Sequence, residues 1–160
     1  MSNICKIDTT QLDKIFENLS EENRNKAMIN SLKEGANVLK ENTQQNLIKK
    51  LGSGATSTVK YKKPMTEGIG IRPEKDYLEV IVSILRDFRL KWFEMGTKER
   101  YRKIRGINSK GKKYVKHDEK GGYTGFITGT HFFKEARENT SPIEEAIIRA
   151  MEAEINKLMQ

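Results

Sequence analysis

Apolar residues recur every three or four positions in three segments of the chain, which is the spacing of amphipathic helices. The first segment covers residues 9–19 and stops at Ser20, a residue type that caps helix N-termini. The second predicts one helix of roughly seven or eight turns that begins after Ser20 and ends at Gly52. The third has Ser141 as its N-cap residue and Pro142 in the first helical position.

Between the second and third of these segments the period of the apolar positions changes to two, which indicates strands. After a loop over residues 52–66, glycine and isoleucine alternate in residues 68–71, and apolar residues alternate in 77–85. Proline and charged residues at 73–76 predict a turn between these two strands. A third strand is expected at 89–95, because the short connection before it favours an antiparallel meander.

The segment between this sheet and the terminal helix predicts a further pair of strands and a short helix. Residues 112–116 and 123–127 contain aromatic and β-branched residues, and we expect them to pair as a hairpin across 118–122. Thr130 could cap a helix over residues 131–138.

These elements together predict an α+β fold. A long N-terminal helix and a C-terminal helix would pack on one face of a small antiparallel sheet of three to five strands, with an extended basic loop or hairpin. A chain of 160 residues has the size of one domain, so we expect a single domain over residues 1–160. Its expected parts are a helical N-terminal part (1–52), the sheet (66–97), the basic loop or hairpin (98–128) and the C-terminal helices (129–160).

The net charge of +8 is concentrated in one segment of the sequence. Residues 98–120 contain ten lysines and arginines against three acidic residues, so this segment alone carries +7. Such a concentration attracts anionic surfaces, either nucleic acid or an acidic protein partner. A solvated loop that lysines keep soluble is the alternative, and the sequence leaves both open. The residues that would make the contacts are Lys98, Arg100, Arg102, Lys103, Arg105, Lys110, Lys112, Lys113 and Lys116.

No segment reaches the length of about 20 apolar residues that spans a bilayer, so we expect no membrane contact. The N-terminal residues lack the apolar region of an export signal, which makes synthesis in a cytoplasm the default expectation. The single cysteine, Cys5, excludes an intramolecular disulfide and a multi-cysteine zinc site.

The residues that could carry acid–base or metal chemistry are Glu94, His117, Asp118, Glu119 and His131. Adjacent residues of an extended segment point to opposite sides, and a loop rich in glycine and lysine is a poor support for a metal. The sequence also lacks a Gly-rich phosphate loop, a nucleophile elbow and paired metal-ligand motifs. We therefore expect no enzyme activity, no cofactor and no metal. A metal-dependent hydrolase built on the two histidines and their acidic neighbours is kept as an alternative.

The only tryptophan lies in the predicted third strand, beside a phenylalanine and a carboxylate. Trp92 and Phe93 could form a base-stacking platform next to the basic segment, but on a strand they face opposite sides. We expect at least one of them to pack in the core. Glu94 could accept hydrogen bonds from backbone N–H groups of the following turn or pair with Arg100 or Arg102, which is a structural role.

Two fragments of the sequence together resemble the signatures of a known family. Residues 92–97 read Trp-Phe-Glu-Met-Gly-Thr, similar to the pattern aromatic, variable, Glu, apolar, Gly-Thr. Residues 130–136 read Thr-His-Phe-Phe-Lys-Glu-Ala, similar to the pattern His-Pro-Phe-apolar-x-x-Ala. The family is a tail-component family of long-tailed DNA phages and prophages, typified by the tenth gene product of a lambda-like coliphage. The matching residues are Trp92, Phe93, Glu94, Gly96, Thr97, His131, Phe132, Phe133 and Ala136.

The resemblance implies a structural role without enzyme activity. Members of the family are described as neck or tail-completion proteins of the head–tail junction, thought to assemble as part of a ring around the DNA exit channel. For this chain the resemblance implies a homo-oligomeric ring in the virion neck or tail, made in the bacterial host cytoplasm. Its partners would be its own copies, the neighbouring connector or head-closure proteins, the tail-terminator protein and, through the basic segment, DNA or an acidic partner. A stand-alone basic nucleic-acid-binding module is the alternative function.

Overall fold

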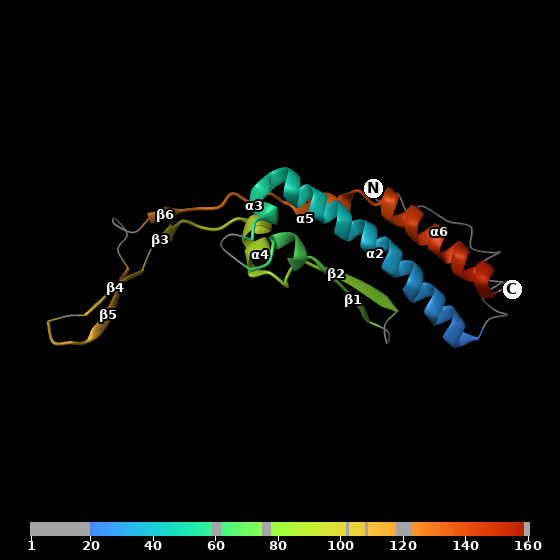
Figure 1. The fold of residues 1–160 in the computed structure, drawn as a ribbon, viewed down its shortest axis with the longest axis horizontal. Coiled ribbons are helices and arrows are strands. Elements are labelled where there is room, and N and C mark those ends of the chain that lie inside the picture. Colours follow the sequence, from blue (N-terminus) through green and yellow to red (C-terminus); the bar gives the residue numbers. More distant parts are fainter. Residues whose placement is uncertain are drawn as a thin grey trace, which may run out of the picture. The chain divides into compact units, whose positions relative to one another are not determined.

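The computed structural model describes residues 20–58, 62–74, 78–101, 103–107, 109–117 and 123–158. The longest element among them is α2 (Glu21–Leu51), a helix of 31 residues (Figure 1). Contacts within the chain define two compact units, and α2 contributes to both. Of the described residues, those within 20–40, 71–82 and 139–158 belong to the first unit, and those within 41–70 and 83–138 belong to the second. The single domain expected over residues 1–160 stays a prediction.

Both ends of α2 lie where the sequence predicts them. The hydroxyl of Ser20 accepts a hydrogen bond from the backbone N–H of Asn23 at 3.4 Å, as the side chain of an N-cap residue does. Gly52 follows the last turn with a φ of 56°, a left-handed conformation that glycine commonly adopts at helix C-termini. The long helix is therefore confirmed, whereas the helix expected at residues 9–19 lies outside the described residues.

In the first unit, α2 packs closely against α6 (Ser141–Leu158). A Cβ atom on Gly35 would overlap the side chain of Ile147, so the lack of a side chain at this glycine permits the close approach of the two helices. Ser31 is fully buried beside them, and its hydroxyl donates to the backbone oxygen of Ala27 at 2.8 Å. Its polar group is thereby satisfied inside the apolar contact.

The C-terminal helix begins with a cap one residue earlier than expected. The backbone N–H groups of Ile143 and Glu144 donate to the backbone oxygen of Thr140 at 2.9 and 3.0 Å, so Thr140 holds the N-cap position. Ser141, the expected cap, is the first helical residue. Its hydroxyl instead contacts the carboxylate of Glu145 at 3.4 Å.

A two-stranded antiparallel sheet packs against the helices. It consists of β1 (Gly70–Glu74) and β2 (Glu79–Ser83), which confirms the two strands predicted there and the α+β class. Glu79 and Ile81 are exposed, whereas the valines that follow each of them are partly buried. This alternation places the apolar face expected from the sequence inward.

The third predicted strand is a helix, α4 (Phe88–Met95). Asp87 holds the N-cap position, and its side chain accepts a hydrogen bond from the backbone N–H of Arg89 at 2.9 Å. Gly96 ends the helix with a φ of 77°, and its N–H donates to the backbone oxygen of Trp92 at 2.8 Å. The two caps favour a helix over the strand that local alternation suggests, and the described strands form separate two-stranded sheets instead of one sheet of three to five strands.

The second unit gathers short helices around the C-terminal part of α2. They are α3 (Ser53–Thr56), the 3-10 helix η1 (Met65–Gly68), α4 and α5 (Phe132–Glu138), so the loop expected at residues 52–66 is partly helical. The short helix predicted before the terminal helix is confirmed as α5. Each helix contributes to the buried side chains of the unit, which include Leu47, Ala55, Met65, Leu90, Phe132 and Ala136.

The basic segment forms an antiparallel two-stranded ribbon in two successive parts, here called the basic ribbon (Figure 1). The first part pairs β3 (Arg100–Tyr101) with β6 (Tyr123–Gly125), and the second pairs β4 (Lys103–Ile107) with β5 (Lys113–His117). The second part is regular over five residue pairs, from Lys103 opposite His117 to Ile107 opposite Lys113. The expectation of an extended basic hairpin is confirmed.

The expected pairing of residues 112–116 with 123–127 is wrong. Both segments pair with residues 100–107 instead, because the chain reverses earlier than expected. Gly111 lies at this reversal with a φ of 72°, a conformation that glycine adopts without steric cost. The turn expected at 118–122 lies outside the described residues.

Candidate functional site

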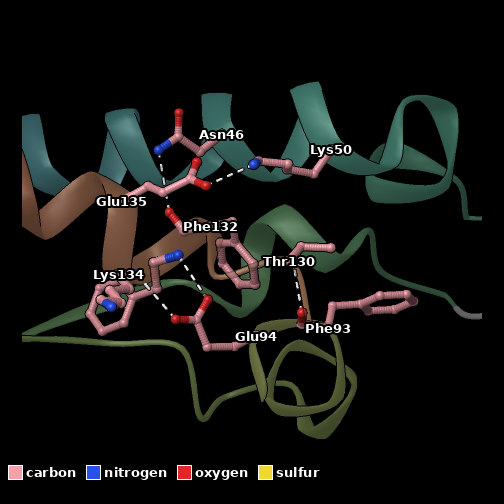
Figure 2. A network of polar contacts seen from close by, with 9 residues as sticks. Asn46, Lys50, Phe93, Glu94, Thr130, Phe132, Lys134 and Glu135 are labelled. Atoms are coloured by element: carbon pink, nitrogen blue, oxygen red, sulfur yellow. Dashed lines mark hydrogen bonds and ion pairs between the residues drawn. The ribbon is translucent and has the colours of Figure 1, made fainter. Parts of the chain in front are cut away.

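The carboxylate of Glu94 lies against the first turn of α5 (Figure 2). Its Oε2 accepts a hydrogen bond from the backbone N–H of Phe133 at 2.8 Å, and its Oε1 accepts one from the N–H of Lys134 at 3.1 Å. These N–H groups have no partner inside their own helix, and a negative charge there also interacts favourably with the helix dipole. The sequence suggests the following turn or an arginine as partner, whereas the structure places the donors in α5.

The backbone around Glu94 is held by the residues that precede α5. The backbone N–H and the hydroxyl of Thr130 both donate to the backbone oxygen of Phe93, at 2.7 and 2.9 Å (Figure 2). The N–H of His131 donates to the backbone oxygen of Glu94 at 3.3 Å. His131 has a φ of 52° and an exposed side chain, so its visible contribution is through the backbone. The two fragments of the family resemblance therefore contact each other directly.

The turn after α4 continues this contact toward the basic ribbon. A Cβ atom on Gly96 would lie 2.8 Å from the backbone nitrogen of Gly129, so the two backbones approach too closely for a side chain. The N–H of Thr97 donates to the backbone oxygen of Ile127 at 2.8 Å, and the hydroxyl of Thr97 accepts from the N–H of Ile127 at 3.0 Å. Gly96 and Thr97 thus join the two chain segments that enter and leave the basic ribbon.

A second set of contacts fixes α5 to α2. The side-chain amide of Asn46 donates to the backbone oxygen of Phe132 at 3.3 Å, and Lys50 forms an ion pair with Glu135 at 2.7 Å (Figure 2). Phe132 and Ala136 are buried on the same helix. Among the fragment residues, these two supply apolar packing, whereas Glu94, Gly96 and Thr97 supply hydrogen bonds and close backbone contact.

Asp87 and Arg89 form an ion pair at the start of α4 that the sequence analysis missed. The guanidinium donates to both carboxylate oxygens, with Nε 2.9 Å from Oδ1 and from Oδ2, and Nη2 also donates to the backbone oxygen of Lys63 at 3.1 Å. The hydrogen bonds from Arg89 hold the pKa of Asp87 below its ordinary value, although partial burial acts in the opposite direction. The sequence signal for this ion pair is an aspartate at a helix N-cap position with an arginine two residues later.

Trp92 and Phe93 lie on a helix, so the expectation that they face opposite sides of a strand is wrong. Trp92 is exposed and makes an edge-to-face contact with Phe88 at 5.0 Å between ring centroids. The guanidinium carbon of Arg100 lies 6.0 Å from the centroid of the Trp92 ring. Phe93 is partly buried. An aromatic and cationic surface therefore lies at the base of the basic ribbon.

Most of the candidate contact residues of the basic segment lie in the strands of the basic ribbon or next to them. Lys98 lies just before β3, and Lys110 and Lys112 are exposed near the reversal. The others that the structure describes are Arg100 in β3, Lys103 and Arg105 in β4, and Lys113 and Lys116 in β5, whereas Arg102 lies outside the described residues. The fold thus gathers the positive charge on one two-stranded element.

Of the residues considered for acid–base or metal chemistry, Glu94 and His131 are neighbours joined by a backbone hydrogen bond. Glu94 is engaged with α5, His131 is exposed, and His117 lies in β5. Asp118 and Glu119 lie outside the described residues. Within those residues, no group of three or more histidine, cysteine, aspartate or glutamate side chains could hold a metal ion.

None of the helices in the described ranges has the length and apolar composition needed to cross a bilayer.

Comparisons of the chain with protein-family models, with curated proteins and with solved structures found no match. The geometry of the contact between α4 and α5 and the two sequence fragments are therefore the basis for a functional proposal.

Proposed function

We propose that this protein is a structural component of the head–tail junction of a long-tailed double-stranded-DNA phage or prophage, and that it assembles as a ring during virion morphogenesis. The observation that supports the proposal is the contact between the two fragments that resemble the family's signatures. Glu94 from the first fragment binds the N–H groups of Phe133 and Lys134 in the second, across 39 and 40 positions of the sequence. Separate short matches are weak signals, but these two form one structural feature.

The contacts of the fragment residues are those of a scaffold. Glu94 and Thr130 bind backbone groups, Gly96 permits close approach, and Phe132 packs in the core. Such residues would fix the direction in which the basic ribbon leaves the helices. A ribbon held at a defined angle suits a protein that must fit between neighbouring rings.

In this proposal the partners are other copies of the chain, the connector or head-closure proteins on one side and the tail-terminator protein on the other. The basic ribbon would face either the DNA in the channel or an acidic surface of a neighbouring ring. No reaction and no cofactor is part of the mechanism, which consists of assembly and sealing of the junction.

Imaging of particles from a strain that lacks the gene tests this function. We expect negative-stain micrographs to show heads and tails that are not joined to each other. Complementation with the wild-type gene should restore joined particles. Normal tailed virions in the absence of the protein would rule out the proposed function.

A stand-alone nucleic-acid-binding module is the second candidate, and the gathering of lysines and arginines on the basic ribbon favours it. Its affinity for DNA should fall steeply with salt as counterions are released from phosphates. Replacing Lys110, Lys112 and Lys113 with alanine should weaken binding and reduce the salt dependence. Unchanged DNA binding by this triple variant would remove the basis for this candidate.

A further inference from the structure

An open cavity in the second unit combines apolar walls with two arginines. Its volume is about 370 Å³. Among the described residues, no acidic side chain lines it, and Asp87, which neutralises Arg89, lies outside the lining. The residues that define it here are Met65, Arg89, Trp92, Phe93, Arg100 and Ile127.

The two arginines of this cavity differ in how their donors are used. Arg89 is bound to Asp87 and to the backbone oxygen of Lys63. The Nε of Arg100 is buried and, in the described part of the chain, has no hydrogen-bond partner. A buried donor of a charged group is costly unless an acceptor satisfies it. A guanidinium matches the geometry of a carboxylate, so a carboxylate is the acceptor best suited to Arg100. Because Nε is buried, the Arg100 side chain must turn outward before a carboxylate from outside the unit can bind it.

An exposed apolar surface lies on α4 and on Leu85, two residues before its cap. The exposed fractions are 72% for Leu85, 59% for Phe88, 40% for Trp92 and 69% for Met95. Phe88, Trp92 and Met95 are spaced four and three positions apart in α4, so they share one side of the helix. Aromatic residues, methionine and arginine are enriched in protein interfaces, whereas a DNA backbone would leave apolar side chains uncovered. The combination favours a protein partner over a nucleic acid.

The outer face of α6 has the complementary composition. Glu145, Ile148 and Glu152 are exposed and follow one another at three and four positions, so they share one face of the helix. Arg149 is exposed on the same side, so the two glutamates flank Ile148 and one arginine, and the face carries a net charge of −1. Glu144 adds a further exposed carboxylate to the first turn of this helix. A helix with this face can supply both a carboxylate for Arg100 and an apolar side chain for the surface of α4.

We propose that the cavity at Arg100 and the exposed surface of α4 bind the outer face of α6 of a second copy of this chain. A glutamate of that helix accepts from the Arg100 guanidinium, and Ile148 of that helix packs on Phe88 and Trp92. The two contacting faces are different parts of the chain, so the contact is heterologous and can repeat from subunit to subunit until a ring closes. The inference rests on the proposed function, since it names the contact from which the proposed ring is built.

The test measures self-association of the full chain by sedimentation velocity and light scattering over a concentration series. We expect the wild-type protein to associate, and Arg100→Glu and Glu145→Lys/Glu152→Lys each to weaken association at least tenfold. Arg100→Gln and Trp92→Ala provide milder changes in case charge reversal prevents folding, which circular dichroism would reveal. Glu34→Lys/Glu41→Lys is the matched control, because these exposed glutamates of α2 have the same spacing of seven residues and the same charge change.

Mixing the two charge-reversal variants tests the proposed contact most directly. The Arg100→Glu variant keeps its α6 face, and the Glu145→Lys/Glu152→Lys variant keeps its Arg100 cavity, so an equimolar mixture should associate more strongly than either variant alone. A mixture that stays monomeric overturns the proposal. Unchanged association of either variant, or a wild-type protein that is monomeric up to about 1 mM, overturns it as well.

The outcomes separate this inference from the proposed function. If deletion of the gene blocks head–tail joining but the variants associate normally, the α4–α6 contact is wrong and the function stands. If the variants lose association but virions form without the protein, the contact stands and the function is wrong. If Arg100→Glu changes only the binding of a DNA oligonucleotide, the cavity receives phosphate and the inference is overturned.

Discussion

The carboxylate of Glu94, in the last turn of α4, accepts a hydrogen bond from the backbone N–H of Phe133 in the first turn of α5, with 2.8 Å between Oε2 and the nitrogen. The two residues are 39 positions apart, and the basic ribbon lies between them in the sequence. A side chain at the end of one helix therefore completes the start of another. This contact holds together the base from which the basic ribbon extends.

Replacement of Glu94 with alanine should lower the free energy of unfolding by about 1–2 kcal/mol, because two N–H groups of α5 lose their acceptor. Urea denaturation followed by circular dichroism measures the change. Glu138→Ala is the control, since Glu138 is an exposed residue at the other end of α5, and its change should stay within about 0.5 kcal/mol. Equal stabilities of the Glu94 and Glu138 variants would show that the cap adds nothing.

Replacement of Gly96 with alanine should destabilise the protein by more than about 2 kcal/mol. Gly96 has a φ of 77°, which disfavours a side chain, and a Cβ atom there would meet the backbone of Gly129. Gly54→Ala is the matched control, because a Cβ atom on Gly54 has no neighbour within 4 Å. Thermal unfolding of the two variants should differ clearly, and similar melting temperatures would contradict the close contact.

Replacement of Gly35 with alanine should push α2 and α6 apart and cost about 1–3 kcal/mol. The new Cβ atom would overlap the side chain of Ile147, so truncation of that side chain should relieve the overlap. The double variant Gly35→Ala/Ile147→Ala is therefore expected to lose less stability than the sum of the two single variants. Strict additivity in chemical denaturation would mean that the two positions do not touch.

The ion pair of Asp87 and Arg89 predicts an acid-dependent loss of stability. Because Arg89 lowers the pKa of Asp87 in the folded state, the stability that the carboxylate adds is complete at neutral pH. It should begin to fall as the pH approaches the unfolded-state pKa of about 4, and it should be lost as the pH falls through the lower folded-state pKa.

Asp87→Asn should cost about 1–3 kcal/mol at pH 7. Its stability difference from wild type should shrink as the pH is lowered toward 2. Urea titrations at several pH values measure both quantities. A difference that stays constant between pH 7 and pH 2 would exclude a contribution from the ionised carboxylate.

The ends of α2 could be predicted from the sequence because the signals for them are local. Ser20 and Gly52 cap the two ends of α2 through contacts with residues close to them in the sequence. Many helices begin and end with such local signals. The same kind of signal was present around α4, where Asp87 and Gly96 bracket eight residues. Alternation of side chains over such a short segment also fits a strand, and the caps decide between the two.

Other features depend on contacts that a sequence pattern does not contain. The strand pairing of the basic ribbon follows from a reversal at Gly111, and one misplaced turn changes every partner. The donors to Glu94 lie in a distant helix, so the carboxylate could be recognised as structural while its partner could not. That the Nε of Arg100 has no hydrogen-bond partner among the described residues becomes visible only after its neighbours have been placed.

The position of this protein in an intact virion tests the proposed function most directly. Antibodies raised against the purified chain and coupled to gold, applied to virions in negative stain, should label the neck between head and tail. A ring of density at the neck of wild-type virions that is absent from heads and tails made without the gene would support the same position. Gold at the capsid surface or tail tip, or no gold on particles that are otherwise complete, would contradict a structural role at the head–tail junction.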